Sequence, residues 1–486
     1  MESYQATYEQ YLIDQGVKIM PSMRQAIEKM MNSTQWENPV SAIDYNNIAV
    51  LTLIEADRTD DLDLRRLYLE TAVSALEQAI DYPLSNVHLA IVHTLLGQTA
   101  QSQNLAFNAL LQNTGVLQAE VNGLFFIPSA LAIEPQLAVI RLVQSQNAAE
   151  QALYLSAIVL LQATPIFYNS MGQRFLNLAH KLFLESPHLA LKQGIALLMS
   201  GQWEGWLDLH RANALSYESS SLSSKIQLAI AIAQNTIQPG SQPITPTVLF
   251  DGLQLAIEPS FSSIVTGVLL GADDWFEAEM EFWRSRILPG MTVIDVGANA
   301  GVYTFSAAQK VGTTGRVIAI EPFSGCVQLL QETIRLNALS QVQVCHGAAS
   351  HASGIAKLAL SRSSELNEIS TAELPEGSYE SVETFTLDSL IDRFDLTQID
   401  FLKIDAEGHE IPILQGSDRL LQEFRPIILY ENIAGSQDSN LPIAELLQRY
   451  QYEIHTYQPY AQAVCKVKNL DEIRGNLNVI AIPRTM

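Results

Sequence analysis

The spacing of apolar residues divides the chain into two parts. Up to about Gln234, apolar residues recur every three or four positions and Gly and Pro are rare. This pattern predicts amphipathic helices, and the short breaks before Pro83 and Pro187 mark helix boundaries. We therefore expect an all-helical domain over residues 1–240.

Two segments of this helical part are similar to each other. His88–Leu111 and His188–Leu215 each place a glycine, Gly97 or Gly201, between two predicted helices. Glycine permits the tight turn of a helix-turn-helix unit. The segments resemble tetratricopeptide-like repeats, which implies a helical-repeat-like domain, and an ordinary helical bundle stays open as the alternative.

A proline-rich break separates the two parts. Gln238–Pro246 holds three prolines and a glycine, which forbid a helix, so we place a linker at residues 241–246 and a second domain at residues 247–486. In this domain short apolar strands alternate with helices, which is typical of an α/β parallel sheet covered on both faces. The expected strands are Thr292–Val296, Arg316–Ile320, Val342–Cys345, Asp400–Ile404 and Pro426–Tyr430, with Tyr452–Tyr457 and Asn478–Ile482 as an antiparallel hairpin at one edge.

Length and charge restrict the class of protein. A chain of 486 residues exceeds the roughly 250–300 residues that one hydrophobic core serves, so several domains are expected. The net charge of −24 repels phosphate backbones and anionic lipids, which argues against nucleic acid and membranes as partners. The first residues lack the basic and apolar segments of a signal peptide, and no apolar run reaches the roughly 18 residues of a membrane span. We expect a cytoplasmic protein.

The main chemical signal is a glycine-containing turn between a strand and a helix. Asp295, Gly297, Asn299 and Gly301 follow the apolar start of the first expected strand and precede the predicted helix Val302–Val311. Glycine lets a ligand approach the main chain, and the amides at a helix start attract a carboxylate or phosphate. The turn is therefore a candidate cofactor-binding site.

A second signal indicates which ligand this turn binds. Glu321 ends the next strand, 20 residues after Gly301, where an acid commonly accepts a hydrogen bond from a ribose. In a dinucleotide fingerprint G-x-G-x-x-G that begins at Gly297, the second glycine is replaced by Asn299, which disfavours NAD. S-adenosylmethionine has an amino-acid tail in place of pyrophosphate, and Asp295 with the Gly297–Asn299 turn offers partners for that tail.

Taken together, the motifs of this domain resemble the FkbM family of methyltransferases. In chain order they are Ile287–Gly290, Asp295–Gly301 with Tyr303 and Thr304, Gly315–Pro322, Leu387-Asp388, Ile399–Glu410 and Gln415-Gly416. The resemblance covers about half the chain. It implies a class I Rossmann-like fold with a mostly parallel seven-stranded sheet, S-adenosylmethionine as donor, and O-methylation of a hydroxyl on a sugar, glycan or natural product.

The resemblance extends the expected cofactor site beyond the turn. It adds Tyr303, Thr304, Pro322 and Ala349. His351 stands where the family often has an acid, so the partner of the adenine amino group stays unassigned. Asp273–Trp283 resembles the helix before the turn, where Glu277 could reach the donor's ammonium group, and a solvated acidic helix face is the alternative.

The carboxyl ends of the fourth and fifth strands are the expected place of catalysis. Asp405 and Glu431 lie there, at the crevice of an open parallel sheet. We expect Asp405 nearest the transferred methyl, as base or as the group that orients a base. His409 is the competing base, because its ordinary pKa suits proton removal near neutrality, and Lys403 is either a catalytic group or the ion-pair partner of Asp405.

Two further acids of the motifs have structural explanations. Glu410 fits the first turn of the following helix. Asp388 fits the N-cap of its own helix.

Two alternatives stay open, and the role of the helical domain depends on them. A divalent metal at Asp405, Glu407 and Glu431 is not favoured, because no His-x-x-x-His or Asp-x-Asp spacing accompanies them. The chain could instead be a helical-repeat scaffold with a degenerate cofactor domain. For an enzyme, we expect the helical domain to present the acceptor, to bind a protein that carries it, or to form a homo-oligomer.

Overall fold

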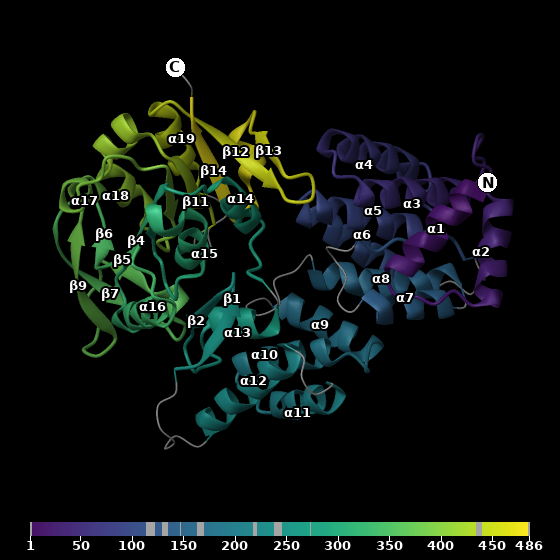
Figure 1. Cartoon of the computed structure of the whole chain (residues 1–486), viewed down its shortest axis with the longest axis horizontal. Coiled ribbons are helices and arrows are strands. Elements are labelled where there is room, and N and C mark those ends of the chain that lie inside the picture. The colour runs from purple at the N-terminus through teal and green to yellow at the C-terminus, as the bar shows by residue number, and fades with distance from the viewer. Residues whose placement is uncertain are drawn as a thin grey trace. The chain divides into compact units, whose positions relative to one another are not determined.

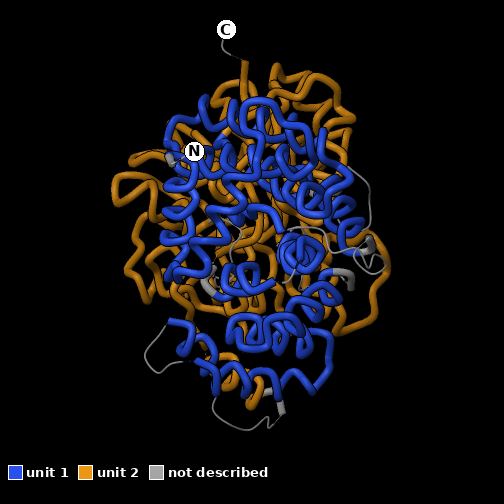
Figure 2. The backbone as a smooth tube through the Cα atoms, turned by 90° about the vertical axis from the view of Figure 1, so that its right-hand side faces the viewer, with its two compact units in different colours: residues 1–227, 460–462 blue, residues 228–459, 463–486 orange. Residues whose placement is uncertain are grey.

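The computed structural model divides into two compact units. The first holds residues 1–227 and 460–462, and the second residues 228–459 and 463–486 (Figure 2). The described residues are 2–112, 122–128, 135–145, 147–162, 170–216, 221–237, 245–272, 274–433 and 440–484. Residues 241–244 of the expected linker lie outside them.

Helices make up the first unit (Figure 1). They are α1 (Glu2–Asp14), α2 (Pro21–Ser33), α3 (Ala42–Arg58), α4 (Leu62–Glu77), α5 (Pro83–Leu95), α6 (Thr99–Gln112), α7 (Pro135–Gln144), α8 (Ala148–Gln162), α9 (Ser170–Leu182), α10 (Pro187–Met199) and α11 (Gly205–Leu215), with α12 (Ser221–Ile237) crossing the limit of the unit. The predicted helical character of this half is therefore correct.

The two similar segments form helix pairs. Gly97 between α5 and α6 and Gly201 between α10 and α11 both have a positive φ, of 73° and 75°. The second pair also packs closely, since a Cβ on Gly205 would lie 2.3 Å from the carbonyl oxygen of Gly194. Two such pairs do not establish a repeat, and the tetratricopeptide resemblance stays a prediction.

An extended segment, residues 122–128, runs through the interior of this unit. Leu124, Phe125, Phe126 and Ile127 are all at most 3% exposed. A buried backbone without a helix or sheet needs other hydrogen-bond partners. Side chains from three helices supply them: Tyr8 and Tyr11 of α1, Asn46 and Asn47 of α3, and His88 of α5.

His88 shows how closely these contacts depend on charge state. Its Nε2 accepts a hydrogen bond from the Phe126 amide at 3.1 Å, so its Nδ1 carries the proton and donates to the Asn46 Oδ1 at 2.8 Å. Burial lowers the pKa of His88 to about 3. The ring is therefore neutral in the folded unit.

Acid should consequently destabilise the helical unit. The unfolded chain binds a proton at His88 below pH about 6.5, whereas the folded chain does so only near pH 3, so stability falls as pH decreases between these values. We expect proton binding at His88 in the unfolded chain to lower the free energy of unfolding by about 2 kcal/mol between pH 7 and pH 5. Urea unfolding followed by circular dichroism at the two pH values measures it. A His88→Gln variant that loses as much stability as the parent chain over this range would refute the assignment.

The second unit is an α/β structure. Its strands are β1 (Thr247–Phe250), β2 (Leu253–Ala256), β3 (Thr292–Val296), β4 (Arg316–Glu321), β5 (Val342–His346), β6 (Ala348–Ala349), β7 (Gly354–Ala359), β8 (Glu368–Ser370), β9 (Tyr379–Phe385), β10 (Phe401–Ile404), β11 (Ile427–Glu431), β12 (Tyr452–Gln458), β13 (Ala463–Lys466) and β14 (Asn478–Pro483). Its helices are α13 (Ile264–Gly271), α14 (Glu279–Arg286), α15 (Val302–Val311), α16 (Ser324–Asn337), α17 (Leu387–Arg393), α18 (Glu410–Gln415) and α19 (Leu441–Arg449), with a π-helical turn at Leu420–Phe424.

The large sheet has the order β13-β12-β14-β11-β10-β3-β4-β5. Strands β5, β4, β3, β10 and β11 are parallel, and β14, β12 and β13 continue the sheet antiparallel. The strand order reverses between β3 and β10, which opens a crevice at their carboxyl ends. This is the predicted Rossmann-like fold, with one correction: β13 pairs with β12 and gives eight strands where seven were expected.

The sequence patterns did not predict several shorter strands. β1 and β2 form a hairpin whose turn residues Asp251 and Gly252 have φ values of 47° and 78°, as a two-residue hairpin turn requires. A second sheet has the order β6-β9-β7-β8. None of these four strands was among those expected from the sequence.

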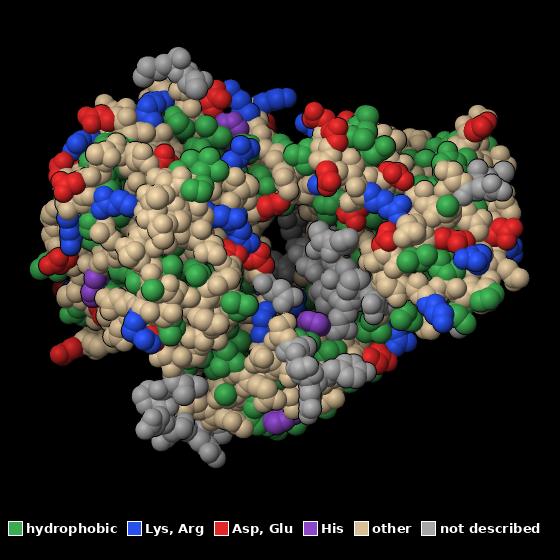
Figure 3. Space-filling view, viewed as in Figure 1, with side chains coloured by type: hydrophobic (Ala, Val, Ile, Leu, Met, Phe, Trp, Pro, Cys, Tyr) green, Lys and Arg blue, Asp and Glu red, His purple; other side chains and the backbone are tan. Residues whose placement is uncertain are grey.

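Two further features are the distribution of charge on the surface and the polarity of the helices. On the face shown in Figure 3, basic side chains are interspersed with acidic ones. In the described part of the chain, every helix is too short or too polar to traverse a lipid bilayer.

Candidate active site

The turn between β3 and α15 lies against the end of β10. Gly297 has a φ of 78°, and its amide donates to the Ile320 carbonyl at 3.0 Å. A Cβ at Gly297 would lie 1.7 Å from the carbonyl oxygen of Asp405. Gly301, with a φ of 94°, precedes the first residue of α15. Only glycine therefore lets this turn and the β10 end approach each other.

Glu321 at the end of β4 holds the turn from the other side. Its two carboxylate oxygens accept hydrogen bonds from the amides of Asn299 and Phe323, each at 2.7 Å. Asn299 has a φ of 49°. Burial raises the pKa of Glu321 to about 7, although both amides favour the ionised form. Pro322, the next residue, has its carbonyl 3.2 Å from the Nε2 of His346.

Asp295 is a buried acid, and only one of its two carboxylate oxygens accepts a hydrogen bond in the described part of the chain. Its Oδ2 accepts a hydrogen bond from the Thr304 hydroxyl at 2.6 Å. The residue is 1% exposed, and its Oδ1 has no hydrogen-bond partner among the described residues. Burial raises its pKa. A buried carboxylate oxygen without a donor carries a large desolvation cost, which a ligand donor would remove.

Glu277 forms hydrogen bonds with residues of α15 and of β14, the last strand. Its Oε2 accepts hydrogen bonds from the Tyr303 hydroxyl at 2.6 Å and from the Asn478 amide at 2.8 Å. Burial raises the pKa of Glu277. The helix expected over Asp273–Trp283 begins only at Glu279, so Glu277 lies in the turn before it, and residue 273 is outside the described residues. Asn478 was missed, because nothing in the sequence connects it with the turn.

Lys403 is a buried cation at the centre of these acids. It is 1% exposed, its Nζ lies 2.6 Å from the Asp405 Oδ2, and the same Nζ lies 4.4 Å from the centre of the Tyr303 ring. Burial alone would lower its pKa, but the negative charges of Asp405, Glu277 and Asp295 hold the pKa above its usual value. Lys403 therefore stays charged and fixes the carboxylate of Asp405.

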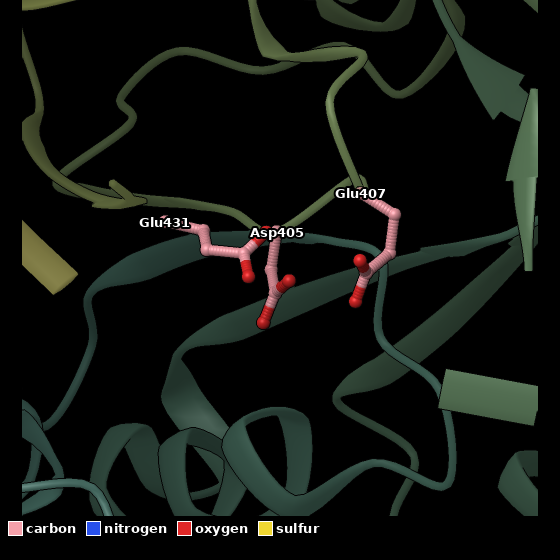
Figure 4. A group of neighbouring side chains, drawn as sticks. All are labelled: Asp405, Glu407 and Glu431. Carbon is pink, nitrogen blue, oxygen red and sulfur yellow. The ribbon is translucent and has the colours of Figure 1, made fainter. Parts of the chain in front are cut away.

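Asp405 gathers with two further acids at the carboxyl ends of β10 and β11. Ligand oxygens of Asp405, Glu407 and Glu431 all lie within 4.8 Å of one another, and Figure 4 shows the three carboxyl groups turned toward a common space. Burial, with Asp405 next in size, raises the pKa of Glu407 to about 8 and that of Glu431 to about 11. Neither glutamate belonged to the predicted catalytic set, although Glu431 ends β11 and Glu407 follows three residues after the end of β10.

His409 has different neighbours. Its Nε2 lies 3.0 Å from the hydroxyl of Ser350, and the described contacts do not join it to Asp405. Burial lowers the pKa of His409, and the neighbouring His351 adds to this effect. Ala349, in β6 next to Ser350, is buried and pairs with Phe385 of β9.

Two structural roles are also visible. Glu410 begins α18, and its Oε1 accepts from the amides of Ala406 and Gly408. Asp388 is not the N-cap of α17, because Thr386 holds that position. Asp388 instead accepts from the amides of Arg419 and Leu420, at the start of the π-helical turn.

Comparison with known proteins gives one match to a family and several to solved structures. The family model for the methyltransferase FkbM domain matches residues 295–454. A search of curated proteins found no match. Among solved structures, an FkbM methyltransferase from Methylobacillus flagellatus KT is 18% identical, with 56% of this chain and 65% of that chain covered and a TM-score of 0.27.

Two other similar structures are smaller proteins. Precorrin-6y C5,15-methyltransferase from Geobacter metallireducens GS-15 is 14% identical, with 42% of this chain and 85% of that chain covered and a TM-score of 0.24. An S-adenosylmethionine-dependent methyltransferase from Aquifex aeolicus is 15% identical, with 42% and 88% covered and a TM-score of 0.24. The family match spans the turn after β3, the crevice and the strands to β12, and residues 295–454 are accordingly a methyltransferase domain of the FkbM family.

Proposed function

We propose that residues 247–486 transfer a methyl group from S-adenosylmethionine to a hydroxyl of a sugar, glycan or natural-product acceptor. The observation that supports this most is the turn at Gly297, which lies against Asp405 and between the acids Asp295 and Glu321. The family match supports methyl transfer, and the acids on either side of the turn suit a donor that contains a ribose and an ammonium group.

The charge of the site fits this donor. Asp295, Glu277 and Asp405 surround Lys403, so carboxylates outnumber the cation that balances them. The Oδ1 of Asp295 has no donor among the described residues. S-adenosylmethionine carries an ammonium group and a sulfonium, and both charges would reduce the cost of these buried acids.

In the proposed roles, each residue acts on the donor or on the acceptor proton. The Gly297–Asn299 turn and Asp295 hold the amino-acid tail, and Glu321 accepts from the ribose hydroxyls. When bound, the donor supplies a methyl group with a neutral thioether as leaving group. Asp405 accepts the proton that the hydroxyl loses as its oxygen bonds to the methyl carbon, and Lys403 keeps the Asp405 carboxylate in place.

Donor binding tests the assignment. Glu321→Ala should weaken S-adenosylmethionine binding by about 10–150-fold, because a charge-assisted hydrogen bond is worth about 1.5–3 kcal/mol. Titration calorimetry on the full chain measures this, with Glu332→Ala on α16 as control, since Glu332 lies on the outer surface of that helix and pairs with Arg335.

The pH dependence gives a second measurement on the same residue. With a pKa of about 7, Glu321 is ionised above that pH, so donor affinity should rise from pH 6 to pH 8. Glu321→Gln should remove most of this rise. Binding of NAD with no binding of S-adenosylmethionine would contradict the proposal. A labelled-methyl screen of hydroxylated acceptors then identifies the substrate.

A further inference from the structure

Glu431 stands out among the buried acids of the site. It is 8% exposed, and its Oε2 has no hydrogen-bond partner in the described part of the chain. The carboxyl group points toward Asp405 (Figure 4). An acid buried to this degree normally has a donor or a cation beside it. The missing partner of Glu431 therefore belongs in the space between the three carboxyl groups.

The protein supplies too little positive charge for this space. Lys403 donates to the Oδ2 of Asp405. Among the described residues it forms no hydrogen bond or ion pair with Glu407 or Glu431, and its charge offsets only a small part of the rise in their pKa values. Glu407 faces the same space from the loop after β10, where its backbone has a φ of 48°. Three carboxyl groups thus share one cation, which is already bound to Asp405.

We propose that Asp405, Glu407 and Glu431 bind one divalent cation of the Mg²⁺, Mn²⁺ or Ca²⁺ class. Carboxylate oxygens are the ligands these ions prefer, whereas Zn²⁺ and Cu²⁺ sites in proteins usually include His or Cys. Water and an acceptor oxygen complete the coordination.

The spacing of the ligand atoms suits this class of ion. Opposite oxygen ligands of Ca²⁺ are about 4.6–5.2 Å apart and those of Mg²⁺ about 4.2 Å. The three ligand oxygens lie within 4.8 Å of one another, which is close to the spacing around Ca²⁺. Small side-chain rotations would bring the oxygens together around Mg²⁺ or Mn²⁺.

The role of this cation rests on the proposed function, although its binding does not. A cation beside Asp405 would lower the pKa of an acceptor hydroxyl bound to it. The hydroxyl would then lose its proton to Asp405 more readily as its oxygen attacks the methyl carbon.

Manganese binding to the full chain tests the site without an acceptor. After chelator treatment and desalting, Mn²⁺ is titrated into the protein, and the loss of the free-ion signal is followed by electron paramagnetic resonance. We expect one saturable Mn²⁺ per chain, displaced by Mg²⁺ or Ca²⁺. Glu431→Gln and Glu407→Gln should each weaken binding about tenfold or more, because each removes a charged ligand.

The controls separate this site from a general effect of buried acids. Glu279→Gln changes an acid that is also 8% exposed but pairs with Asn478, and it should bind Mn²⁺ like the parent chain. Glu407 is half-buried in a loop, so its variant remains informative if the Glu431 variant does not fold.

Two results would overturn the inference. One is the absence of saturable Mn²⁺ binding by the parent chain. The other is a folded Glu431→Gln or Glu407→Gln variant that binds Mn²⁺ unchanged. The parent chain could bind S-adenosylmethionine but no Mn²⁺, with a lower donor affinity in Glu431→Gln. In that case the carboxylates contribute to donor binding, and only the cation site is wrong. Mn²⁺ binding without donor binding would instead contradict the methyltransferase proposal.

Discussion

Asp405→Asn should slow methyl transfer by about 10²–10⁴-fold, the range that a positioned proton acceptor contributes. The substitution keeps the shape of the side chain but removes the charge that accepts the acceptor's proton. Donor affinity should change little, because the proposed donor contacts are made by the turn at Gly297, by Asp295 and by Glu321. Single-turnover assays with labelled donor, on the acceptor found by screening, measure the rate, and calorimetry measures the donor affinity.

A matched variant distinguishes this effect from a change in surface charge. Asp392→Asn alters an exposed acid of α17 that pairs with Arg419, and it should leave the rate unchanged. A large loss of rate in His409→Ala together with a normal rate in Asp405→Asn would assign the base to His409 instead.

Lys403→Met should destabilise the α/β unit by about 3–5 kcal/mol, because removing one partner of a buried ion pair leaves the other charge uncompensated. Asp405, Glu277 and Asp295 all depend on this ammonium group. For a domain of this size, the loss corresponds to about 6–20 °C in melting temperature. Differential scanning calorimetry on the full chain measures the transition.

Two further variants check the origin of this effect. Lys310→Met, on the exposed face of α15, should leave the melting temperature almost unchanged. Adding Asp405→Leu to Lys403→Met should restore part of the stability, since it removes the stranded charge. Asp405→Leu is also measured alone. If the double variant loses as much stability as Lys403→Met and Asp405→Leu lose together as single variants, the ion pair is not the source of the effect.

The sequence predicts the main sheet well because its strands are apolar and bounded by turns. Each expected strand from Thr292 to Asn478 is present with boundaries that differ by at most one residue. The pattern fails where strands are short or half-exposed. β13 holds only four residues, none of them fully buried, and β8 holds only three.

The candidate site is less predictable because its members come from distant parts of the chain. The turn at Gly297 carries its own signal, since positive φ angles and close backbone contacts require glycine. The contact of Glu277 with Asn478 joins residues 201 positions apart, and no local pattern encodes it. The hydrogen bonds of Asp388 likewise go to the amides of Arg419 and Leu420, outside its own helix.

The extended segment at residues 122–128 has a consequence for the order in which the helical unit folds. The hydroxyl of Tyr8 in α1 reaches the backbone of Phe125, 117 positions later, and His88 reaches Phe126 across 38 positions. Helices α1, α3 and α5 therefore cannot complete their polar interior until residue 127 has left the ribosome. Stacked repeats gain stability one repeat at a time, whereas this part of the chain should fold late, in a single cooperative step.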